Sequence, residues 1–334
     1  MKANVLNVDE QSGYEEMLLS DEWFAGGVTH KGTDGAYAMK LHEHDKYNGS
    51  LRARKSFFAF KNRIICLGTD IENSLKGAPV HTTLFQNYVG NAPSWEPMPV
   101  EGRKDILRDH SHALYFVNGG KIHFSVGLQQ SLHEETDEYT EGYFEKAYID
   151  HGDIIKGEGY EYMVYMPTWN NEDINFNADT LARYAANLPY KVLRKETNIH
   201  GVLDIPSGIR AFAVFEQGNV DETILECSPA MVMYSVAEGT MTLSVSNPDL
   251  ALYEGPSDEI FDENGKRVER SVYSRKWINN PCADTKVYMT INGLWDLADT
   301  DGVKVKAKQQ NGNTVLEFTS KEARTEEITL KKIN

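Results

Sequence analysis

The chain has 334 residues, 40% of them hydrophobic and 10% aromatic, which predicts a folded protein with a substantial core. Its formal net charge of −16 argues against a nucleic-acid binder, because phosphate contacts require clustered Lys and Arg. Three cysteines without a CxxC pair argue against a disulfide-stapled scaffold or a zinc ribbon.

Short strand-like segments separated by turn residues run along most of the chain. In chain order, the predicted strands are residues 37–41, 56–60, 63–67, 113–117, 121–126, 161–166, 208–215, 231–235, 240–246, 286–291, 303–308, 314–318 and 327–331. Turn signals lie between several of them, at Asn118-Gly119-Gly120, Glu263-Asn264-Gly265 and Asn311-Gly312. Strands of this length and density predict an all-β fold built from antiparallel sandwiches.

One helix is predicted between residues 177 and 189. Asn177 is suited to cap its start, and one face carries Leu181, Tyr184, Ala185 and Leu188. Pro189 ends it, so we expect a short connection packed on a sheet.

A polar, turn-rich stretch at residues 217–222 divides the chain. We expect a larger domain at residues 1–220 and a smaller β-domain at residues 221–334. The charged, turn-rich residues 248–275 are expected to form a long excursion of the second domain.

Charge is unevenly distributed. Between residues 46 and 63 there are six basic residues and no acidic one, namely Lys46, Arg52, Arg54, Lys55, Lys61 and Arg63. Between residues 134 and 161, ten acidic residues stand against Lys146 and Lys156. This pattern allows a polyanion to dock on the basic patch while the acidic side stays in solvent, although two solvated strand edges are the plainer interpretation.

No self-sufficient catalytic motif is visible: a Gly-rich phosphate loop, GxSxG and HExxH are all absent. His42 and His44 would share one strand face, but a metal would need a third ligand, so no metal site is predicted. Cys66 lies in an apolar run and is expected to be a core residue.

Several aromatic residues are candidate sugar platforms, because a pyranose face can stack on a ring. They are Trp23, Phe24, Tyr47, Trp95 and Trp169, with a core role as the alternative for each. The first ten residues contain no apolar segment typical of a secretory signal, and no window approaches the length of a transmembrane helix.

Residues 24–87 resemble the central β-sandwich of polysaccharide lyase family 8, most of all its chondroitin ABC lyase branch. The resemblance rests on Phe24-Ala25-Gly26-Gly27-Val28, His44-Asp45-Lys46-Tyr47, Leu51-Arg52-Ala53-Arg54-Lys55-Ser56, Cys66-Leu67-Gly68-Thr69-Asp70 and Thr82-Thr83-Leu84-Phe85-Gln86-Asn87. It continues downstream at Tyr160-Glu161-Tyr162, Val192-Leu193-Arg194, Ser246-Asn247-Pro248-Asp249-Leu250 and Ser271-Val272-Tyr273-Ser274-Arg275. One departure is His81, where an acidic residue is expected in this branch.

The resemblance implies a lyase architecture with an N-terminal helical toroid, a large antiparallel sandwich and a smaller C-terminal β-domain. The family's catalytic His, Tyr, Arg and Glu are expected upstream of Met1, so no catalytic residue is assigned here, and the sandwich is expected to be truncated at its N-terminus. Substrate contacts are predicted at His44, Lys46, Arg52, Arg54 and Lys55. A divalent cation in the parent enzyme is left open, and the parent is expected to be secreted, periplasmic or on the cell surface.

Three functional interpretations follow. The chain is the C-terminal portion of a lyase that cleaves chondroitin or dermatan sulfate by β-elimination, inactive without the helical domain. Alternatively, it is a non-catalytic module that binds polyanionic carbohydrate, or a purely structural support domain. Salt-dependent binding to chondroitin sulfate separates the last two.

Overall fold

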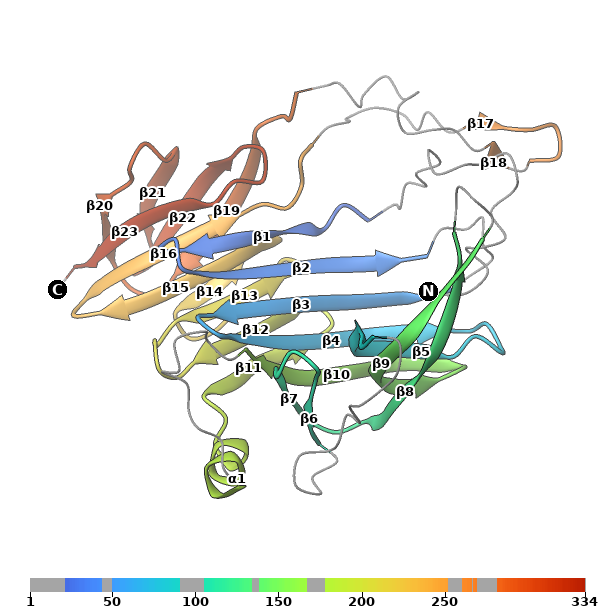
Figure 1. Cartoon of the computed structure of the whole chain (residues 1–334). Coiled ribbons are helices and arrows are strands. Elements are labelled where there is room, and N and C mark those ends of the chain that lie inside the picture. The colour runs from blue at the N-terminus through green and yellow to red at the C-terminus, as the bar shows by residue number, and fades with distance from the viewer. Residues whose placement is uncertain are drawn as a thin grey trace.

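The computed structural model of the chain is built almost wholly from antiparallel strands (Figure 1). It describes residues 22–43, 50–90, 105–133, 138–166, 178–251, 260–265, 267–268 and 281–333. The all-β prediction is confirmed.

Sheet A has seven strands and forms the framework of the N-terminal part. Its order is β1 (Ala25–His30), β2 (Asp34–His42), β3 (Arg52–Phe60), β4 (Arg63–Asn73), β10 (Ile155–Tyr165), β7 (Leu114–Val117) and β6 (Ile106–Arg108). Sheet B covers one side of it with three strands in the order β5 (Val80–Tyr88), β9 (Tyr139–Gly152) and β8 (Lys121–Leu132).

Sheet C also has seven strands, in the order β11 (Tyr190–Glu196), β12 (Ile199–Asp204), β13 (Arg210–Val214), β15 (Ala230–Ala237), β16 (Thr240–Ser246), β23 (Glu326–Lys332) and β20 (Trp295–Asp299). Sheet D follows with β14 (Ile224–Cys227), β19 (Thr285–Ile291), β22 (Asn313–Ser320) and β21 (Val305–Gln310). A two-stranded ribbon joins β17 (Ile260–Phe261) to β18 (Arg267–Val268). Sheet C thus contains strands from both sides of the predicted boundary at residues 220 and 221, and that boundary stays a prediction.

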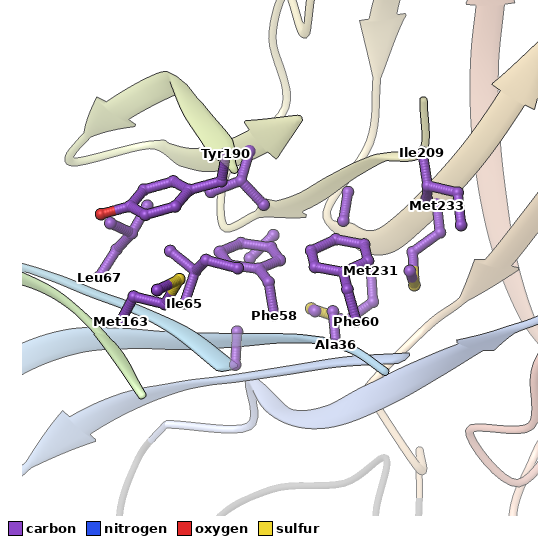
Figure 2. Close-up of a cluster of buried hydrophobic side chains, with 14 of the residues drawn as sticks. Ala36, Phe58, Phe60, Ile65, Leu67, Met163, Tyr190, Ile209, Met231 and Met233 are labelled. Atoms are coloured by element: carbon purple, nitrogen blue, oxygen red, sulfur yellow. The ribbon is translucent and has the colours of Figure 1, made fainter. Parts of the chain in front are cut away.

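Three apolar clusters fix the order of the layers as B, A, C and D. The first lies between sheets A and C, where Phe58, Phe60 and Ile65 face Tyr190 and Met231 (Figure 2). The second lies between sheets C and D, and the third between sheets A and B. Because successive side chains of a strand point to opposite faces, β3 and β4 supply residues to two clusters at once. This explains why Ile65, Cys66 and Leu67 are all buried.

The predicted helix is confirmed as α1 (Ala178–Ala186). Leu181 is 2% exposed, and Tyr184 packs against Phe116, with ring centroids 5.4 Å apart. Several strand boundaries were wrong. Residues 63–67 were expected to end at Gly68, but β4 continues to Asn73, and β8 likewise extends to Leu132 instead of residue 126. Gly68 lies inside β4 and pairs with Tyr160 on the neighbouring strand β10. The ring of Tyr160 lies over Gly68 and occupies the space that a side chain would need, so the glycine serves packing within the strand and does not end it.

Within the described part of the chain, none of the helices has the length and apolar character needed to cross a bilayer.

Candidate functional site

The predicted substrate-contact residues lie on or near β3, but they do not form one surface. His44 and Lys46 lie outside the described residues. Arg54 shares a face of β3 with Phe58 and points toward sheet C, whereas Lys55 points toward sheet B.

Arg54 connects two layers. Its guanidinium donates hydrogen bonds to the backbone carbonyl of Thr197 and to Glu216 Oε1, the latter at 2.7 Å. Its Cζ lies 5.7 Å from the centroid of the Phe215 ring, and its Nε lies 3.9 Å from Asp70 Oδ2. Only 17% of the Arg54 side chain is exposed, and its partners are internal. Arg54 therefore acts as a structural link, or strut, that joins sheet A to sheet C.

Lys55 lies on the opposite face, at the margin of the cluster between sheets A and B. Its Nζ is 5.8 Å from the ring centroid of Phe57, and the Phe57 ring neighbours Tyr37 at 6.4 Å. Burial lowers the pKa of Lys55 below the usual value for a lysine. Tyr37 is 42% exposed, so an accessible aromatic ring lies beside Phe57, the ring that Lys55 contacts.

Arg52 is exposed at the start of β3, with His42 and Glu72 as its register neighbours on β2 and β4. Of the predicted set on β3, it is the residue with the most freedom to reach a ligand.

A buried histidine lies beside Arg54. His200 contacts the hydroxyl of Ser56 at 2.8 Å through Nδ1 and that of Thr69 at 3.0 Å through Nε2. Burial, reinforced by Lys195 and Arg54, lowers the pKa of His200 to about 3. The imidazole is therefore neutral at ordinary pH and joins the layers rather than serving as a surface base.

The predicted platforms have different environments. Phe24 is fully buried, while Trp23 is 45% exposed; Tyr47, Trp95 and Trp169 lie outside the described residues. Cys66 is a core residue as predicted, and burial raises the pKa of its thiol to about 12. The exposed ring of Tyr37 was missed, although its alternation with Ala36 and Ala38 on a strand marks it as facing away from the first core cluster.

A cavity of about 470 Å³ lies between α1 and strands β6, β7, β10 and β11. Its wall includes Asp105 and Glu161, and Glu161 accepts a hydrogen bond of 3.2 Å from the hydroxyl of Tyr190. These carboxylates make the cavity unsuitable for a polyanion. Among the residues that the structure describes, no group of three or more His, Cys, Asp or Glu side chains is arranged to hold a metal ion.

We expect Arg54→Ala to lower the free energy of unfolding by about 1–2 kcal/mol, because it removes the hydrogen bond to Thr197 and an ion pair whose partner is half exposed. Urea denaturation measures the change, with Arg52→Ala as the matched control on the same strand. Equal stability of the two variants would contradict the strut role.

Comparisons with known proteins agree with this architecture. The family model for the polysaccharide lyase family 8 super-sandwich domain matches residues 1–178. The chain is 39% identical to a chondroitin sulfate ABC exolyase of Bacteroides thetaiotaomicron, over 99% of this chain and 32% of that protein. It is 36% identical to a chondroitin sulfate ABC exolyase of Proteus vulgaris, over 90% of this chain and 31% of that protein. The chain therefore spans about a third of the length of these relatives.

Solved structures show the same fold. A chondroitin AC lyase of Streptomyces coelicolor in complex with chondroitin sulphate superimposes with a TM-score of 0.67 at 19% identity, covering 93% of this chain and 36% of that one. A Paenibacillus xanthan lyase gives a TM-score of 0.68 at 16% identity, covering 95% of this chain and 29% of that one. Since the family model covers more than half of the 334 residues, the chain belongs to polysaccharide lyase family 8.

Proposed function

We propose that this chain is the C-terminal β-portion of a lyase that cleaves chondroitin or dermatan sulfate by β-elimination, working with a helical catalytic domain. The observation that carries the proposal is the 39% identity to an exolyase over 99% of this chain and 32% of that protein.

The chemistry of β-elimination supports a division of labour between two parts. The reaction needs a base for the proton α to the uronate carboxyl, a group that neutralises this carboxylate, and an acid for the leaving oxygen. The histidine beside the predicted contact residues, His200, is neutral and buried between two hydroxyls, and Arg54 is held by Thr197 and Glu216. In this proposal the chain shapes and supports the substrate cleft, with Arg52 and Lys55 kept as contacts for the polymer.

The exposed aromatic residues suit docking onto further protein or polymer surface. Trp23 is 45% exposed and Tyr37 42%, so both rings are accessible to such a surface. We further propose that the parent enzyme acts outside the cytoplasm, where sulfated glycosaminoglycans occur.

The test is the absorbance of the unsaturated uronate product with chondroitin sulfate as substrate. We expect no product from the isolated chain even at large excess. A chimera in which this chain replaces the matching third of the Bacteroides thetaiotaomicron exolyase should form product, because the two proteins are 39% identical over 99% of this chain.

The control is the same exolyase with that third deleted, which should be inactive. Product from the isolated chain would contradict the division of labour. An inactive chimera that is folded by circular dichroism would contradict the assignment as a functional part of a lyase.

A further inference from the structure

The outer face of sheet B, which points away from sheet A, has a different character from the rest of this acidic protein. Alternation along β9 sends Glu141 and Glu145 to the inner face, together with the core residues Ala147 and Ile149. Glu145 is fully buried and accepts hydrogen bonds from Asn87 and from the backbone of His110. The acidic residues of β9 are thus divided between the two faces of sheet B. Asp150 is the one carboxylate that β5, β8 and β9 present on the outer face.

Cationic and imidazole groups gather around this single carboxylate. Lys121 Nζ lies 2.9 Å from Asp150 Oδ2, and Nε2 of His123 lies 3.4 Å from the same oxygen. His81 Nε2 lies 3.8 Å from Oδ1. Burial holds the pKa of His81 below its usual range despite Asp150. Lys121 and Lys146 supply the lysine charges of this face.

A row of rings crosses the three strands next to these charges. Tyr148 on β9 stacks on His81 from β5, with centroids 4.1 Å apart, and is nearly parallel to His123 from β8, at 5.3 Å and 13°. Lys146 Nζ lies 5.0 Å from the Tyr148 centroid. The groups around the stack remain accessible to solvent, since the Lys121 side chain is 70% exposed and that of His123 is 40% exposed.

A flat aromatic platform lies further along the same face. A Cβ atom at Gly142 would be 2.6 Å from Cε2 of Tyr88, so the tyrosine ring lies directly over the backbone of β9 at this glycine. Phe144 contacts the ring edge, with centroids 5.6 Å apart, and Tyr88 is 54% exposed. Between the Tyr88 ring and the row formed by His81, Tyr148 and His123, the side-chain amide of Gln86 donates a hydrogen bond of 2.8 Å to Gln129 Oε1.

We propose that the outer face of sheet B binds an anionic polysaccharide, with Tyr88 stacking on a sugar ring and Lys121 and Lys146 meeting carboxylate or sulfate groups. The nine residues from Gly142 to Asp150 span about 26 Å along β9, enough for several sugar residues in a row. Complementary charge favours this occupant, because two lysines, Lys121 and Lys146, stand against one carboxylate, Asp150, on this face, although the whole chain has a net charge of −16. The choice of polymer rests on the proposed function, but the surface is separate from β3.

The test measures binding of a fluorescent chondroitin sulfate oligosaccharide to the full chain over a salt series. Lys121→Gln combined with Lys146→Gln should weaken binding about tenfold at low salt and flatten its salt dependence. Tyr88→Ala should weaken binding about tenfold with the salt dependence unchanged, because stacking is not ionic. The matched control combines Lys304→Gln with Lys308→Gln, two exposed lysines in and next to β21, and should bind like wild type.

Each outcome decides the matter. Equal loss in the control pair, or equal binding of neutral dextran, would overturn the inference in favour of unspecific attraction. Unchanged binding by the variant with both Lys121 and Lys146 replaced would contradict the inference, because the polysaccharide would then bind at another surface. If the isolated chain binds nothing while the chimera still forms product, the inference fails and the proposed function stands; circular dichroism confirms that each variant is folded.

Discussion

Gly201→Ala should lower the free energy of unfolding by about 3 kcal/mol, even though it adds only one methyl group. Gly201 pairs with Phe212 across β12 and β13, and a Cβ atom at Gly201 would be 2.3 Å from Cδ1 of that ring. Phe212 is fully buried in the cluster between sheets C and D and is stacked beside Tyr234. The ring therefore has no space into which it can move, and overpacking strains both layers.

A matched substitution separates this clash from a general effect of replacing glycine. Gly127 lies on β8 with an ordinary backbone angle, and nothing lies within 4 Å of a Cβ atom built there. Gly127→Ala should be neutral or slightly stabilising, because alanine restricts the unfolded chain. Urea unfolding of both variants measures the difference. Equal free energies of unfolding would show that sheet C yields around Phe212, contrary to the packing described.

The strands show what the alternation of polar and apolar residues can and cannot predict. Period-two polarity located most strands of sheets A and C, because their core faces are regularly apolar. It missed β1, β5, β6, β9, β11, β12, β14 and β20, and the two-stranded ribbon of β17 and β18. In β9, charged residues occupy both faces, and the burial of Glu145 depends on Asn87 and His110 from other segments. In β12, Gly201 interrupts the pattern for a ring that lies 11 residues away in sequence.

The candidate site was less predictable than the fold, for a physical reason. Arg54 and Lys55 are neighbours in sequence, and therefore a strand must send them to opposite faces. The partner of Arg54 is distant in sequence, since Arg54 meets Glu216 across the gap between sheets A and C, whereas Lys55 lies beside Phe57 of its own strand. The order of four layers is set by which cluster each face joins, and no local pattern carries that information. The Tyr88 platform likewise depends on Gly142 of another strand.

Acidification from pH 7 to pH 5 should destabilise the chain by about 2 kcal/mol through His200 alone. Burial lowers the pKa of this imidazole to about 3 in the folded state, whereas an exposed histidine has a pKa near 6.5. Below pH 6.5 the unfolded chain binds a proton that the folded chain rejects, so stability is complete above this pH and is lost progressively as pH falls toward 3. The cause is structural: a charged ring between Ser56 and Thr69 would be desolvated beside Arg54 and Lys195.

Urea unfolding at the two pH values, on wild type and on His200→Gln, isolates this contribution. Glutamine can still hydrogen-bond one of the two hydroxyls but binds no proton, so the variant should be less stable at pH 7 and lose about 2 kcal/mol less on acidification. His133→Gln, at an exposed position after β8, serves as the control for a histidine replacement that leaves Ser56 and Thr69 untouched. Burial also lowers the pKa of His30, which contacts Ser244 at 2.7 Å, so the residual loss in the His200 variant should have the same sign. If His200→Gln lost as much stability as wild type, the proton would be entering elsewhere, and His200 would not be the buried neutral link between sheets A and C.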